Sequence, residues 1–288
     1  QTIDIDESYM QDTLSDDVFK NKNFSKIQLK ELYKYSKKNN VELFTTPGDI
    51  SSLKKIKSLN FPGIKISSGL MTNIPLIEEA IKHSKPIIIS TGMAYKRELH
   101  KIINLFKKYN FKKYIILQCT AKYPNDDVDV NLNSMTYIKD KYKCLVGYSD
   151  HTLDDLACIN SVALGAKVIE KHFTIDNSLP GADNAISMDP IQFKKMVIKI
   201  KRTFVQMGEY NLKPTSYETI ERNKRHRYFV SKNFIKKNTF FSIQNVCMKR
   251  LVYSKSAISS FEPEKIFKKK SNKDIKKNEI IKLHDIKR

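Results

Sequence analysis

One unit recurs along the first two thirds of this chain: a short β-branched or aromatic run that ends in polar residues, followed by an amphipathic helical stretch. Such an alternation predicts a parallel sheet with right-handed β-α crossovers. The runs are Val41–Thr46, Gly63–Ser68, Pro86–Thr91, Lys113–Thr120, Cys144–Asp150 and Lys167–Phe173.

Helical patterns fill the intervals between these runs. Asn73 provides a capping side chain and Pro75 an early proline, both typical of a helix N-terminus. Gly165 ends a later apolar stripe, as a glycine after a helix does. The sequence predicts helices over 73–84, 96–109, 154–165 and 189–208.

The polar residues at the strand ends favour one of two parallel-sheet architectures. An open doubly wound sheet often carries a glycine-rich phosphate loop, and this chain has neither G-x-G-x-x-G nor a P-loop. A (β/α)₈ TIM barrel gathers all of its strand ends at one face. The runs end in groups that can do chemistry, namely Thr46, Lys65, Ser68, Ser90, Gln118, Ser149 and His172. We therefore predict a TIM barrel.

A barrel of eight strands needs two more than the runs found here. We expect the other two to precede Val41, with a polar loop over 2–21 and Gln1 as the last residue of the second strand. On this interpretation the barrel lacks its first two strands, and a chain that opens on Gln1 is expected to be part of a longer gene product.

The character of the chain changes after Gly208. We predict a partial TIM-barrel domain over 1–208, a linker over 209–224 and a small β-rich domain over 225–288. The tail repeats itself, because Asn233–Asn238 matches Lys273–Asn278, and each copy is followed by an apolar pair. Two like turns in so short a domain predict a pseudo-two-fold module that serves as a lid.

The net charge of +21 comes from 52 Lys and Arg against 31 Asp and Glu. A basic polyanion-binding module is one interpretation, but no zinc finger, RNP motif or aromatic-interleaved basic stripe is present. A general bias towards Lys, Asn and Ile accounts for the charge more simply, so we expect no nucleic acid partner. No stretch approaches the roughly 20 apolar residues that span a bilayer, so we expect no membrane segment.

The cysteines are scattered along the chain and form no C-x-x-C pair. That spacing argues against a disulfide framework and against a thiolate zinc site. We expect structural thiols and a cytoplasmic protein. The positions are Cys119, Cys144, Cys158 and Cys247.

Two histidines follow consecutive predicted strands. A barrel would place His151 and His172 side by side at one face. Neutral imidazoles suit a divalent transition metal, with water or substrate completing its coordination. A capping or core role for both side chains is the alternative.

Phosphate recognition needs hydroxyls, backbone N–H groups and a cation. Ser90, Thr91 and Gly92 follow a strand and offer the first two, and Lys65 on the neighbouring strand can provide the cation. Each residue also has a structural reading: Ser90 and Thr91 as helix caps, and Lys65 as a core lysine paired with a carboxylate. Their convergence on one rim favours an anionic ligand.

Several of these motifs, in this order, resemble the N-acetylneuraminate (sialic acid) synthase family, which includes legionaminic and pseudaminic acid synthases. The tail is similar to the C-terminal antifreeze-like (SAF) domain of that family. The motifs are Gly63–Pro75 (GIKISSGLMTNIP), Pro86–Met93 (PIIISTGM), Cys119–Pro124 (CTAKYP), Gly147–Leu153 (GYSDHTL), Val162–Phe173 (VALGAKVIEKHF) and Pro180–Asp183 (PGAD).

The resemblance implies a TIM barrel with a SAF lid, working as a domain-swapped homodimer with Mn²⁺ or another divalent metal. His151 and His172 would hold the metal and, with Lys65 and Tyr123, act in catalysis. Phosphoenolpyruvate would contact Thr46, Lys65, Ser68, Ser90 and Ser149. The sugar would contact Gln1, Tyr123, Asp183 and, from the lid of the other subunit, Arg250.

The implied reaction condenses phosphoenolpyruvate with N-acetylmannosamine or a related acylated aminosugar and releases a nonulosonic acid and phosphate. This chain departs from the family pattern at Leu70, Gln118, Ala121 and Lys249–Val252, and the acidic residue of the first family strand has no counterpart here. A truncated or diverged inactive homologue is therefore the alternative within the family.

Overall fold

The computed structural model describes residues 24–57, 59–181, 183–251 and 256–287. The chain divides into two compact units, with the boundary between Gly208 and Glu209. Each unit has a hydrophobic core of its own. Among the described residues, every helix is too short or too polar to cross a lipid bilayer.

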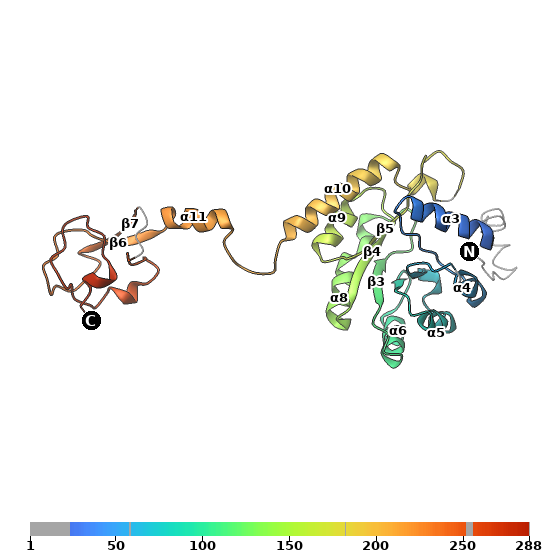
Figure 1. Cartoon of the computed structure of the whole chain (residues 1–288), viewed down its shortest axis with the longest axis horizontal. Coiled ribbons are helices and arrows are strands. Elements are labelled where there is room, and N and C mark those ends of the chain that lie inside the picture. Colours follow the sequence, from blue (N-terminus) through green and yellow to red (C-terminus); the bar gives the residue numbers. More distant parts are fainter. Residues whose placement is uncertain (1–23, 58, 182, 252–255, 288) are drawn as a thin grey trace. The chain divides into compact units, whose positions relative to one another are not determined.

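The first unit is built on a curled sheet of parallel strands, which pair in the order of the sequence. Figure 1 shows its helices packed along one side of the sheet. The strands are β1 (Ile64–Ile66), β2 (Ile87–Ser90), β3 (Tyr114–Cys119), β4 (Leu145–Asp150) and β5 (Ile169–Lys171).

The first predicted strand, Val41–Thr46, is largely wrong. Only one bridge remains of it, between Thr45 and Ile64 next to β1. Pro47 follows immediately, and a proline lacks the N–H that a strand ladder needs and restricts the residue before it.

The four predicted helices are present close to their predicted ranges, as α5 (Ile74–Lys82), α6 (Lys96–Lys108), α9 (Leu156–Ala163) and α10 (Pro190–Met207). The structure adds helices that were not predicted, namely α3 (Lys26–Lys38), α4 (Ile50–Lys57), α7 (Asp127–Val130) and α8 (Leu132–Tyr142), with short 3₁₀ turns at Ser68–Leu70 and Asn184–Ile186. The Asn73 side chain caps α5 by accepting a hydrogen bond from the Leu76 N–H, as the sequence predicts.

The strand register separates the two faces of the sheet. On the face towards the helices, isoleucines such as Ile66, Ile89 and Ile116 are fully buried against the apolar sides of α5 and α6. Because side chains alternate along a strand, the intervening residues Lys65 and Ser90 lie on the inner, concave face. The sheet therefore presents an apolar outer layer and a polar inner end.

The second unit contains α11 (Ser216–Arg225), the antiparallel strands β6 (Arg227–Ser231) and β7 (Val246–Arg250), and 3₁₀ turns at Pro263–Lys265 and Leu283–Asp285. Helix α11 occupies most of the segment predicted as a linker. Thr215 caps it with a reciprocal capping box to Glu218.

The internal repeat of the tail forms a reciprocal pairing. The N–H of Ile235 donates to the carbonyl of Ile275 at 2.9 Å, and the N–H of Ile275 donates back at 2.8 Å. Asn238 and Asn278, which end the two copies, both adopt a left-handed conformation. This pairing confirms the predicted pseudo-two-fold arrangement.

Gly147 on β4 leaves no space for a side chain. A Cβ added there would lie 2.3 Å from the carbonyl oxygen of Val168 and 2.5 Å from a methyl carbon of Leu117. We expect Gly147→Ala to lower the free energy of unfolding by about 1–3 kcal/mol, because the backbone of the next strand must move. Urea unfolding followed by circular dichroism measures this.

Gly69→Ala is the matched control, since nothing lies within 4 Å of a Cβ at that position. Equal stability of Gly147→Ala and Gly69→Ala would show that β4 and β5 do not approach each other in this way.

Candidate functional site

A row of polar side chains lines the inner face at the carboxyl ends of the strands. Lys65 on β1 donates from Nζ to Ser90 Oγ on β2 at 2.7 Å. Ser149 on β4 donates to Glu170 Oε1 on β5 at 2.9 Å, and the same carboxylate oxygen lies 3.3 Å from Lys65 Nζ. The strands thus bring together one ammonium, two hydroxyls and one carboxylate.

Glu170 was missed by the sequence analysis. It lies two residues before His172 in the run VIEKHF, so the alternation of a strand places both on the inner side. That spacing is the signal that could have identified it. Its carboxylate confirms the alternative considered for Lys65, a lysine paired with an acidic partner.

The serine at position 68 lies beside the loop after β2. Its Oγ accepts a hydrogen bond from the Gly92 N–H at 3.0 Å. Gly92 allows this approach because a Cβ there would lie 2.7 Å from the same oxygen. Thr46 follows the bridge at Thr45 at the edge of the sheet and is half-buried.

The two predicted histidines lie side by side, with ring centroids 5.2 Å apart. The Tyr123 ring contacts both, at 4.0 Å from His151 and 5.7 Å from His172. Asp183 lies near the second, with Oδ2 3.6 Å from His172 Nδ1. Burial is the main cause that raises the pKa of Tyr123, and the charges of Cys119, Asp183 and Glu170 raise it further. The cluster of Tyr123 and the two histidines therefore lies next to Glu170 of the polar row.

His151 has the hydrogen bonding of a metal ligand. Its Nδ1 lies 2.7 Å from the carbonyl oxygen of Thr120, which leaves Nε2 for another partner. Burial lowers its pKa, and a neutral imidazole is the form that coordinates metals. His151 and His172 therefore fit a divalent ion as a pair. Within the described residues no cluster of three or more His, Cys, Asp or Glu completes such a site.

A buried ion pair lies behind the histidines, on the outer face of the sheet. Lys171 Nζ is 2.6 Å from Asp150 Oδ2, and both side chains are almost completely buried. The Asp150 carboxylate also accepts hydrogen bonds from the Tyr148 and Thr152 hydroxyls. Lys171 additionally donates to the carbonyl oxygens of Thr152 and Asp154. These residues directly precede or follow the histidines and fix their backbone.

Three predicted site residues lie elsewhere. Gln118 does not join the inner row: it pairs with Tyr148 in the register and faces the helices, because its neighbour Cys119 occupies the inner face. Arg250 ends β7 in the second unit. Gln1 lies outside the described residues.

The cysteines are free thiols, as expected. Cys119 and Cys158 are buried, whereas Cys144 and Cys247 are partly exposed. Burial raises the pKa of Cys119 and of Cys158, which favours unreactive thiols at both positions.

A model described as the NeuB family matches residues 4–211. An uncharacterised protein of Methanocaldococcus jannaschii is 38% identical over 81% of this chain and 69% of its own length. The N,N'-diacetyllegionaminic acid synthase of Campylobacter jejuni is 37% identical over 88% of this chain and 75% of its own length.

A solved structure is similar as well. The crystal structure of N-acetylneuraminic acid (sialic acid) synthetase from Leptospira borgpetersenii, in complex with citrate, is 32% identical with a TM-score of 0.67. The similarity covers 73% of this chain and 78% of that one.

The buried pair predicts a large stability effect. Lys171→Met leaves the Asp150 carboxylate buried without its cation, so we expect a loss of about 3–5 kcal/mol in the free energy of unfolding. Lys199→Met is the control, because Lys199 pairs with Asp155 at the surface. Urea unfolding of both variants measures the difference, and equal midpoints would contradict a structural role for the buried pair.

Proposed function

This chain belongs to the NeuB family, and we propose that it condenses phosphoenolpyruvate with an open-chain N-acylated aminosugar. The products are a nonulosonic acid and inorganic phosphate. Homologues are synthases of sialic and legionaminic acids, which supports this type of condensation.

One observation carries the proposal: the row of polar side chains and the two imidazoles lie on the same inner face of the sheet. Lys65, Ser90 and Ser149 offer one cation and two hydroxyls to the carboxylate and phosphate of phosphoenolpyruvate. Ser68 and Thr46 extend the row towards the same rim. An anionic substrate would take over the interaction that Glu170 makes with Lys65.

The second substrate is proposed to bind beside the histidines. Tyr123 stacks near both rings and is half-exposed, so its hydroxyl is available to the sugar. Asp183, on the far side of His172, offers a carboxylate to sugar hydroxyls. His151 and His172 would hold Mn²⁺ or another divalent ion, which when bound polarises the sugar aldehyde as a Lewis acid.

The proposed reaction joins the two substrates and then expels phosphate. C3 of phosphoenolpyruvate forms the new carbon–carbon bond to the aldehyde carbon, and the aldehyde oxygen takes up a proton. Water adds to C2 and gives up one of its two protons. The C2 hydroxyl then loses the second proton to the departing phosphate as the C2–O bond to phosphate breaks, which leaves a ketone at C2 and inorganic phosphate. Lys65 and the serine hydroxyls stabilise the charge on the leaving phosphate. Glu170 accepts a hydrogen bond from Ser149, which holds that hydroxyl in position, and its carboxylate can accept the proton of the water.

The second unit is proposed to act as a SAF-type lid on the other subunit of a domain-swapped homodimer. Arg250 is exposed at the end of β7, which leaves its guanidinium free to reach a sugar acyl group. The length of the chain between the units permits such an exchange, since 209–215 contains no regular element.

A second candidate is a polyanion-binding role for the tail. Residues 209–288 contain 21 Lys and Arg against 8 Asp and Glu, a larger excess than in the rest of the chain. An inactive homologue that retains this basic unit would bind a polyanionic glycan in a salt-sensitive way. Binding to heparin that is independent of both His151 and His172, without phosphate release, would favour this alternative.

We expect His151→Ala and His172→Ala each to abolish Mn²⁺-dependent phosphate release from phosphoenolpyruvate and N-acetylmannosamine or a diacetamido sugar. Chelation by EDTA should do the same to the unchanged protein, with recovery on addition of Mn²⁺. His100→Ala on the exposed side of α6 is the control and should retain activity. Full activity of either site variant would refute the metal assignment.

The exchanged lid predicts complementation between two inactive variants. A mixture of Arg250→Ala and His172→Ala, unfolded and refolded together, should regain roughly a quarter of the original rate, because half of the random dimers are mixed and each has one intact site. Each variant refolded alone is the control. A mixture as inactive as its components would show that the lid acts on its own subunit.

A further inference from the structure

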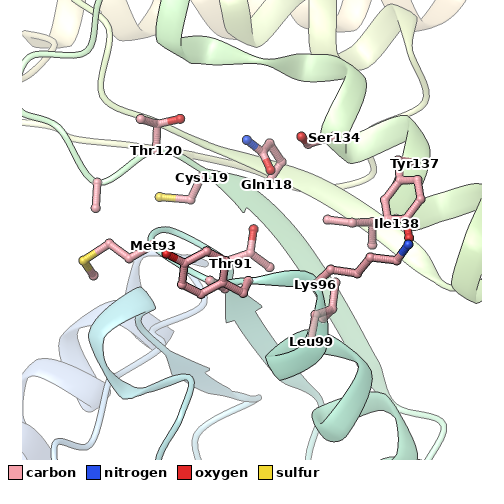
Figure 2. A pocket seen from close by; sticks show the side chains of 13 residues that line it. Thr91, Met93, Lys96, Leu99, Gln118, Cys119, Thr120, Ser134, Tyr137 and Ile138 are labelled. Carbon is pink, nitrogen blue, oxygen red and sulfur yellow. The ribbon is translucent and has the colours of Figure 1, made fainter.

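A cavity of about 490 Å³ opens on the outer side of β2 and β3, between helices α6 and α8. Figure 2 shows its lining, with Gln118 and Ser134 on one side and Leu99 and Lys96 on the other. Gln118 points away from the inner row of Lys65 and Ser149, so its part of the cavity lies on the outer face of the sheet, while the mouth of the cavity reaches Cys119 and Ala121 at the strand end.

The Gln118 side chain has an unmet capacity for hydrogen bonding. The residue is only 8% exposed, and among the described residues its amide has no hydrogen-bond partner. Its amide atoms are not among the buried unsatisfied atoms of the described residues, so they face the open cavity, where water or a ligand can pair with them. The Thr91 and Thr120 hydroxyls of the wall donate to backbone carbonyls. The Gln118 amide and the Ser134 and Tyr137 hydroxyls remain as polar groups that can meet a ligand, and Gln118 is the most deeply buried of these three.

The charge of the lining defines the ligand further. Lys96 is the one charged side chain among the described residues that line the cavity, and its Nζ lies 5.3 Å from the centre of the Tyr137 ring. Leu99 and Ile138 are buried and give the cavity an apolar floor. A cation at the rim, an apolar floor and a buried amide suit a molecule with an apolar body, one acidic group and one polar atom.

We propose that this cavity is a second binding site, for a small aromatic or branched-chain carboxylic acid. Its carboxylate lies towards Lys96 and the Tyr137 hydroxyl, its body rests on Leu99 and Ile138, and a ring N–H or hydroxyl pairs with the Gln118 amide. The site does not depend on the condensation reaction, and Gln118, Leu99 and Ile138 lie outside the strand-end row.

Indole-3-acetate is a suitable probe, because the chain contains no Trp and the fluorescence anisotropy of the indole reports its binding directly. We expect saturable binding to the full chain. Gln118→Leu, which keeps the volume but removes the amide, should weaken binding about fivefold, the effect of one neutral hydrogen bond. Lys96→Met should weaken it less and should remove most of its dependence on salt.

Ser134→Phe fills the cavity from α8 and should abolish binding even if Gln118→Leu proves unstable, and circular dichroism confirms the fold of each variant. Lys101→Met, on the exposed side of α6, and Lys65→Met, in the inner row, are the controls and should bind as the unchanged chain does. Undiminished binding to Ser134→Phe, or displacement of the probe by phosphoenolpyruvate, would overturn the proposal.

Discussion

The buried ion pair between Asp150 and Lys171 fixes the ends of β4 and β5 to each other, and each histidine of the candidate site follows one of its members directly. Two charges so fully removed from water are stable only when paired and hydrogen-bonded, and the Tyr148 and Thr152 hydroxyls complete that environment. The outer face of the sheet therefore determines where the imidazoles on the inner side lie. The spacing of His151 and His172 depends on residues that no substrate touches.

The alternation of side chains between the two faces of a strand explains most of what the sequence could predict. Apolar runs with helical patterns between them were sufficient to locate β1 to β5 and to place Lys65, Ser90 and Ser149 on one face. The same alternation, applied more strictly, would have placed Gln118 on the outer face, because Cys119 and Ser149 pair across the inner one. Polarity at a strand end alone does not determine which way a side chain points.

Other parts of the site depend on contacts between distant segments, which local patterns do not encode. Glu170 and Lys171 are neighbours in the sequence, yet Glu170 contacts Lys65 on β1 and Lys171 contacts Asp150 on β4. In the proposed exchange of lids, the place of Arg250 over a substrate would depend on the assembly of two chains. Two imidazoles also do not determine which metal ion is bound, because several divalent ions accept the same nitrogen ligands.

The reciprocal pairing of the tail has a consequence for how that unit folds. Ile235 and Ile275 satisfy each other's backbone groups across 40 residues, and the N–H groups of Asn238 and Asn278 donate to the carbonyl oxygens of Ser271 and Ser231. These bonds between the two copies form only when both halves are in place, so a nucleus that contains them must close a long loop. High contact order of this kind makes folding slow and cooperative. A nascent chain would have to emerge almost to its end before the unit could become stable.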